Sequence, residues 1–205
     1  MVQTVRLRPV ETRDAAALAA LYTGQRAFLA PFEPIHPESF FTEEGQLAAL
    51  EHAVALMHQD RAYRFCIVAD DSVVGILSVS NVVRKAFQSA TLGYFVAEEW
   101  NGRGIATAAV GVAVSWALGP ARLHRLEAAT LPDNLASQKV LIRNGFVEMI
   151  VPPLWLSTPT LPLPAATRKS PLPSLVNVPP VMLNASPFTF LASRAVTMPF
   201  AKSFT

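Results

Sequence analysis

The stretch EEWNGRGIATAAVGVAVSWAL, residues 98–118, joins an acidic pair to a glycine-rich turn and then continues without a charged residue. The uncharged part predicts a helix buried against a sheet and ended by Gly119 and Pro120. If this helix begins near Gly104, the amides of residues 104–107 have no partner within the helix and lie at its positive end. Because such a group of amides is suited to phosphate, the stretch predicts an anion site in front of a buried helix.

Two other interpretations of Gly102 and Gly104 compete with an anion site. The glycines alone are a weak motif, and they would serve equally in a tight turn from a strand into a helix. A dinucleotide-binding turn would need a third glycine where Thr107 stands, and an acidic residue about 20 positions later, where the sequence has Arg122. Three strands are also expected before the glycines, so the context excludes the dinucleotide interpretation.

Hydrophobic periodicity and turn residues divide residues 1–151 into strands and helices. Alternating apolar residues predict strands, and apolar residues three and four positions apart predict helices. The segment 31–38 carries three prolines and is predicted to be a loop. The expected strands are residues 4–10, 63–70, 72–83, 89–98, 124–130 and 146–151, and the expected helices are residues 12–30, 42–60, about 104–118 and 134–145.

Composition excludes several classes of function. The net charge of +2 is too small to indicate a nucleic-acid partner. The amino-terminal residues are charged early, unlike a signal peptide, and the uncharged run 104–121 is shorter than the roughly 20 residues that span a bilayer. The four histidines have no metal-ligand spacing, so no metal site is expected. A cytoplasmic protein that acts on neither membrane nor nucleic acid is the simplest interpretation.

The single cysteine, Cys66, lies in an expected strand of the core. It cannot form a disulfide within the chain, so the fold does not depend on oxidation. A free cysteine in such a strand usually behaves as a small hydrophobic residue, and the alternative is a reactive thiol.

Composition changes abruptly after residue 151, which predicts a domain at 1–151 and a distinct tail at 152–205. The tail contains 11 of the 17 prolines but neither glycine nor an acidic residue. Frequent proline removes backbone donors and blocks helices and central strands, so the tail is expected to be poorly ordered. Two explanations stay open, namely a divergent extension and translation out of frame from about position 150.

Three stretches resemble the GNAT acyltransferases. NGRGIA (101–106) is similar to their acetyl-CoA pyrophosphate loop, Gln/Arg-x-x-Gly-x-Gly/Ala, although Asn101 departs from it at the first position. HRLEAATLPDNLASQKVLIRNGF (124–146) resembles the second half of the same fold, and LRPVETRDAAALAAL (7–21) resembles its first strand and helix. The best resemblance, over about residues 3–150, is to the RimJ/RimL-like subgroup, which acetylates amino-terminal alanines of ribosomal proteins.

The resemblance implies an α+β fold of the GNAT type. Its mixed central sheet is splayed between the fourth and fifth strands and has helices on both faces. Residues 89–98 would form the strand beside the pantetheine arm, and residues 124–130 would diverge from it. The tail leaves open whether the final strand is present. Leu156 stands about where some relatives carry a carboxylate base, and no acidic residue follows Glu148.

The resemblance also implies site residues. Ser137 would protonate the departing CoA thiolate. Glu98 and Glu99 are candidate bases from their own position, at the end of the strand expected over 89–98. Each of these residues also has a structural alternative. Ser137 would be a hydroxyl in the first turn of a helix, and Asn134 would only cap that helix. Glu98 and Glu99 would be a solvated acidic pair, and Tyr94 would be a core residue. The expected cofactor-binding residues are Phe95, Val96, Asn101, Gly102, Arg103, Gly104, Ile105, Ala106, Thr107 and Asn134.

The expected activity is acetyl-CoA-dependent acetylation of a primary amine by direct attack. The acceptor implied is the amino terminus of a protein or peptide, with a ribosomal protein as the example, and the enzyme would be a monomer or a homodimer. The alternative is a catalytically impaired domain that binds CoA without turnover.

Overall fold

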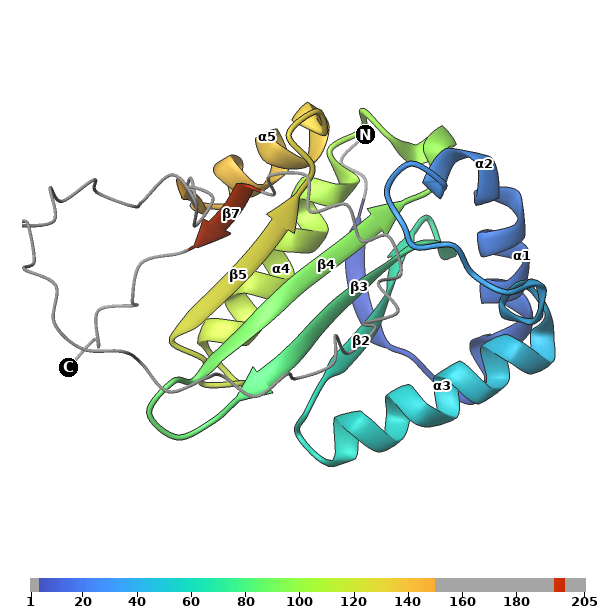
Figure 1. The fold of residues 1–205 in the computed structure, drawn as a ribbon, viewed down its shortest axis with the longest axis horizontal. Helices are drawn as coiled ribbons and strands as arrows, with labels where there is room; N and C mark the ends of the chain where they lie inside the picture. The colour runs from blue at the N-terminus through green and yellow to red at the C-terminus, as the bar shows by residue number, and fades with distance from the viewer. Residues whose placement is uncertain (1–3, 150–193, 198–205) are drawn as a thin grey trace, which may run out of the picture.

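A single mixed β-sheet organises the computed structural model, which describes residues 4–149 and 194–197 (Figure 1). The strand order is β1-β2-β3-β4-β5-β7-β6, and every neighbouring pair is antiparallel except β4 and β5, which are parallel. The strands are β1 (Val5–Pro9), β2 (Tyr63–Ala69), β3 (Ser72–Val83), β4 (Ser89–Val96), β5 (Arg125–Thr130), β6 (Val147–Met149) and β7 (Arg194–Thr197).

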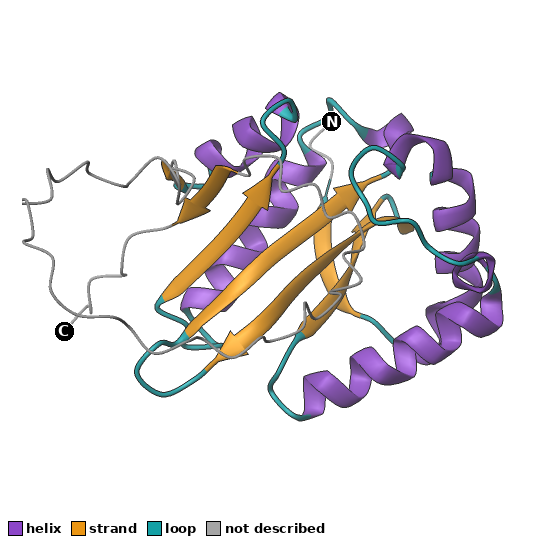
Figure 2. Ribbon diagram, viewed as in Figure 1, coloured by secondary structure: helices purple, strands orange, loops and turns teal. Residues whose placement is uncertain are grey.

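Helices cover both faces of this sheet, as predicted (Figure 2). On one face, α1 and α3 pack on a core that includes Leu18, Leu50 and Ile76. On the other face, α4 packs on a second core that includes Leu77 and Leu126. The α-helices are α1 (Ala15–Gly24), α2 (Arg26–Leu29), α3 (Glu43–His58), α4 (Ile105–Leu118) and α5 (Leu135–Arg143), and the 3-10 turns are η1 (Thr12–Asp14), η2 (Glu38–Phe41) and η3 (Glu98–Trp100).

The helix expected over 12–30 is divided into η1, α1 and α2. Gly24, a weak helix former, is the last residue of α1, and Gln25 leaves the helical conformation at φ −97° and ψ 4°. The Gln25 side chain is held by the loop after β4, because its Oε1 accepts from Glu98 N at 2.8 Å and its Nε2 donates to Glu99 Oε2 at 3.0 Å. This long-range contact fixes α2 beside the end of β4.

The fourth and fifth strands separate, as the resemblance implied. Their parallel pairing runs from Ser89↔Arg125 to Leu92↔Ala128 and then stops. Beyond that point β4 remains paired with β3 through residue 96, whereas the end of β5 pairs with β7 on its other side. Among the described residues, the edge of β4 from Gly93 to Val96 that faces β5 therefore has no strand partner.

The open question of a further strand is answered within the described residues. Arg194–Thr197 forms β7, which pairs antiparallel with both β5 and β6 and completes the sheet between them. These four residues come from the Pro-rich segment. The predictions made for residues 150–193 and 198–205 lie outside the described part of the chain.

Candidate active site

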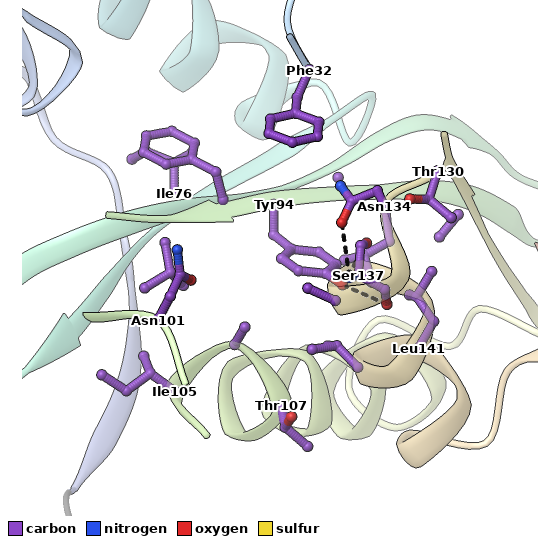
Figure 3. Close-up of a pocket in the computed structure, with 18 of the residues that line it drawn as sticks. Phe32, Ile76, Tyr94, Asn101, Ile105, Thr107, Thr130, Asn134, Ser137 and Leu141 are labelled. Carbon is purple, nitrogen blue, oxygen red and sulfur yellow. Dashed lines mark hydrogen bonds between the residues drawn. The ribbon is translucent and has the colours of Figure 1, made fainter. Parts of the chain in front are cut away.

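A cleft of about 970 Å³ opens where β4 and β5 separate (Figure 3). Its walls come from both faces of the sheet. Tyr94 and Ile105 belong to the side that carries α4, whereas Tyr22, Phe28 and Leu29 belong to the side that carries α1 and α2. The cleft thus connects the two faces through the gap in the sheet.

The glycines of the opening stretch form one end of this cleft. Gly102 and Gly104 adopt left-handed backbone conformations, at φ +75° and +79°, which glycine adopts without strain. A Cβ atom at either position would meet no atom of residues 4–149 or 194–197 within 4 Å, so this part of the chain leaves the space in front of both open. Both glycines and the first turn of α4 line the cleft.

The amides at the start of α4 are available to a ligand in this cleft. Ala108 donates the first helical hydrogen bond, to the Gly104 carbonyl at 2.9 Å, so the amides of Ile105, Ala106 and Thr107 precede the helical ladder. Together with the positive end of the helix dipole, they make a site suited to phosphate. Arg103, expected to add a cation, does not line the cleft; its guanidinium lies 4.9 Å from the ring centroid of Trp100.

Asn134 and Ser137 lie at the start of α5 and line the same cleft as the glycine loop (Figure 3). The Asn134 Oδ1 accepts a hydrogen bond from the Ser137 amide at 3.0 Å, so the expected helix cap is confirmed. Asn134 lines the cleft as well, and its contact with a cofactor stays a prediction.

The Ser137 hydroxyl is paired with Tyr94 of β4. Their oxygen atoms are 3.0 Å apart, and the Tyr94 hydroxyl also lies 3.3 Å from the Ser137 carbonyl oxygen (Figure 3). Burial raises the pKa of Tyr94, so this hydroxyl keeps its proton at neutral pH. Tyr94 packs on the α4-side core and also lines the cleft, so its core assignment was incomplete. Two neutral hydroxyls therefore meet at this wall.

The remaining expected residues are divided between the cleft and its rim. Phe95, Val96 and Asn101 line the cleft, as do the residues of the glycine loop other than Arg103. Glu98 is exposed and is not among the lining residues; its amide is bound to Gln25, whose side chain also binds Glu99. A base role for Glu98 stays a prediction.

Three charged residues of the cleft were missed by the sequence reasoning. Lys139 and Arg143 on α5 both line it, and their spacing of four on one helix face was a usable signal. Glu33 lines the cleft from the loop after α2. A Pro-rich loop has no periodicity that would predict which of its side chains faces a cleft. Only the folded chain brings that loop beside the end of β4.

Cys66 is a core residue, as predicted. It is fully buried, and burial together with the nearby Asp14 carboxylate raises the pKa of its thiol to about 12. The thiol is therefore neutral and inaccessible at physiological pH. Among the described residues, no cluster of His, Cys, Asp or Glu could hold a metal ion, and no helix is long and apolar enough to cross a membrane.

Comparisons with known proteins agree with this architecture. Residues 4–147 match the family model described as an acetyltransferase (GNAT) domain. The chain is 36% identical over 146 residues to "Probable N-acetyltransferase YjcK" of Bacillus subtilis, covering 70% of this chain and 81% of that one. It is 34% identical over 142 residues to the [ribosomal protein uS5]-alanine N-acetyltransferase of Escherichia coli, covering 68% and 73%.

A solved structure supports the same assignment. Mycobacterium smegmatis RimJ, in complex with CoA-disulfide, superposes with a TM-score of 0.68 at 34% identity and covers 71% of each chain. The sheet with its splayed strands, the glycine loop before α4 and the sequence comparisons lead to one conclusion: the chain belongs to the GNAT acetyltransferase family.

Proposed function

We propose that the protein transfers the acetyl group of acetyl-CoA to the N-terminal α-amine of a protein, with amino-terminal alanine of a ribosomal protein as the first acceptor class. One observation carries the proposal: a single cleft passes between β4 and β5 and is lined by α4 amides on one side and by α1 and α2 on the other. Such a cleft can hold two ligands end to end. A cytoplasmic location belongs to the same proposal.

The residues present fit acetyl-CoA, whose diphosphate is anionic and whose thioester supplies the activated acyl group. A Cβ at Gly102 or Gly104 would occupy the space that is open in front of the α4 amides. Lys139 and Arg143 add positive charge on the same side of the cleft. These features together favour a phosphate-bearing ligand at this end.

The exposed edge of β4 would orient the rest of that ligand. From Gly93 to Val96, the β5-facing backbone groups have no strand partner in the described part of the chain, because the parallel ladder ends at Leu92↔Ala128. Backbone groups alternate between the two edges of a strand, and the bond from Ala97 N to Val74 O sets those of Phe95 toward β3. The backbone groups of Val96 are therefore placed to hydrogen-bond the amides of an extended ligand arm, as a neighbouring strand would, whereas Phe95 lines the cleft without offering its backbone there. Such bonding would fix the thioester beside the gap.

The acid–base demands of the reaction favour an α-amine. An α-amine with a pKa near 8 is roughly one-tenth neutral at pH 7, whereas a lysine amine with a pKa near 10.4 is neutral to less than about one part in a thousand. An amino-terminal acceptor therefore needs little help from a base. The only cysteine, Cys66, is fully buried, so the chain offers no thiol for an acyl-enzyme, and direct attack is proposed.

Ser137 is the proposed acid for the departing thiolate. Replacing Ser137 with alanine is expected to lower kcat about tenfold, which is less than the usual hundredfold for a lost acid, because the Tyr94 hydroxyl remains at the same wall. Steady-state kinetics at saturating acetyl-CoA measure this change. Tyr94→Phe serves as the matched variant, and an unchanged kcat in both variants would remove the two hydroxyls from the reaction.

Thiol release from acetyl-CoA tests the proposed function. The assay uses a panel of short peptides, each with a free amino terminus or with the same terminus acetylated. Release is expected with the free peptides only, and more with alanine at the first position. Calorimetric titration with acetyl-CoA is measured in parallel. Binding without release on any peptide would indicate the alternative, a domain that holds CoA without turnover.

A further inference from the structure

The charged side chains of the cleft are separated between its two sides. Lys139 and Arg143 lie on α5, which packs with α4, whereas Glu33 lies in the loop after α2 on the opposite face of the sheet. Glu33 is the only acidic residue among the described residues that line the cleft. One side is therefore suited to an anion, and the other offers a single carboxylate.

The Glu33 carboxylate stands in largely apolar surroundings. Phe28, Leu29 and Phe32 line the cleft beside it, and only 27% of its side chain is exposed. The loop is anchored there because the Glu33 amide donates to the Leu29 carbonyl at 3.0 Å. A carboxylate placed this way attracts a cation more strongly than one surrounded by water, because the effective dielectric constant is lower.

Glu33 also retains capacity for a cationic ligand. Glu38, in the same loop region, is fully engaged by Arg26, whose two terminal nitrogens lie 2.5 and 2.9 Å from its carboxylate oxygens. Within the part of the chain that the structure describes, the only ion pair of Glu33 is with His36, whose Nε2 lies 3.5 Å from Glu33 Oε2. Arg26 lines a neighbouring hollow together with Glu33, but its guanidinium is paired with Glu38. The His36 ring is stacked on Phe40, with centroids 3.9 Å apart.

A second hollow, of about 140 Å³, meets the main cleft at Glu33. Tyr22, Leu29 and Glu33 line both hollows, so the carboxylate stands at their junction. The second hollow continues along Pro34 and Ile35 toward the surface, where the Ile35 side chain is exposed. A chain that entered along this loop would bring its leading end to Glu33.

We infer that Glu33 binds the ammonium group of the acceptor, an inference that rests on the proposed function. The class of ligand is a primary ammonium at the end of a peptide chain. At pH 7 an α-amine is mostly protonated, so the carboxylate recognises the predominant form of the acceptor. Charge-assisted hydrogen bonds from the ammonium to Glu33 would hold the nitrogen on the acceptor side of the gap between β4 and β5. Before the attack the ammonium would release one proton to solvent, because only the neutral amine has the lone pair that bonds to the thioester carbon.

Replacing Glu33 with glutamine tests the inference while preserving side-chain size. The KM for the best peptide of the panel is expected to rise about tenfold to a hundredfold, because a charged hydrogen bond is lost. The dissociation constant for acetyl-CoA, measured by calorimetry, is expected to stay unchanged. Glu33→Asp, which keeps the charge, is expected to give an intermediate KM.

A binding comparison separates recognition from a structural effect. With CoA bound, the wild-type protein is expected to bind a peptide with a free amino terminus about tenfold more tightly than the same peptide with a hydroxyl in place of the amine. Glu33→Gln is expected to lose this preference. Glu38→Gln, which disturbs the same loop by removing the Arg26 pair, is expected to keep it.

The outcomes distinguish the inference from the proposed function. Normal acetylation with an unchanged acceptor KM in Glu33→Gln would overturn the inference and leave the function intact. An equal rise of KM in Glu38→Gln would also overturn it, since the loop and not the carboxylate would then be responsible. Absence of acetylation by the wild-type protein would overturn both.

Discussion

Replacing Gly104 with valine is expected to lower the affinity for CoA at least about a hundredfold, equivalent to about 2.7 kcal/mol, while leaving the fold intact. The Cβ and its methyl groups would project into the open space in front of the α4 amides, since no atom of the described residues lies within 4 Å of an added Cβ. The left-handed backbone conformation at position 104, with φ +79°, is also strained for a β-branched residue. Calorimetric titration with CoA measures the loss.

The matched control is Gly24→Val. Gly24 is exposed at the end of α1, has no atom within 4 Å of an added Cβ and does not line the cleft, so CoA affinity is expected to stay at the wild-type value. Thermal unfolding of both variants checks that the chain still folds, because the left-handed strain at Gly104 amounts to only about 1–2 kcal/mol. Tight CoA binding by folded Gly104→Val would place the diphosphate elsewhere.

Removing the Asp14 carboxylate is expected to lower the free energy of unfolding by about 3 kcal/mol at pH 7. Asp14 is the last residue of η1 and directly precedes α1, and its side chain is only 8% exposed. Its oxygens accept from both terminal nitrogens of Arg8, at 2.6 and 3.0 Å, and from the Glu11 amide at 2.8 Å. Urea denaturation of Asp14→Ala measures the change, and Arg6→Ala, which removes only an exposed pair with Asp71, should change stability much less.

The same carboxylate gives a defined pH dependence. Burial alone would raise the pKa of Asp14, but hydrogen bonds from Arg8 and the Glu11 amide outweigh it and hold the pKa below its ordinary value of 3.8. A depressed pKa contributes stability above 3.8, and that contribution is lost as the pH falls through the lower value of the folded state. The stability difference between wild type and Asp14→Ala should therefore shrink below about pH 4, and a constant difference would contradict this assignment.

The local signals in the sequence predicted most of the fold. Alternation and helical periodicity placed β1 to β6, and the Asn134 cap and the Gly119–Pro120 stop follow local backbone chemistry. The break at Gln25 was missed because its cause, a contact with the loop after β4, lies more than 70 residues away. The parallel pairing of β4 with β5 and their separation came from the family resemblance.

The residues of the candidate site likewise divide into those that local signals predict and those that depend on tertiary packing. Residues of one contiguous motif, such as Gly102 to Thr107, could be named because a helix start presents its own amides. The position of the Arg103 side chain could not be predicted, because its guanidinium lies over the Trp100 ring and not in the cleft. Glu33 and Tyr94 could not be assigned, because only tertiary packing brings the loop after α2 and the α5 hydroxyl to the same gap.

The passage through the sheet has a kinetic consequence. Because its walls belong to both faces, the two reactants of a transfer have separate sets of contacts in one cleft. Direct attack, as proposed, would require both reactants to occupy the cleft together in a ternary complex. The enzyme's double-reciprocal plots would intersect, in contrast to the parallel lines of a ping-pong scheme.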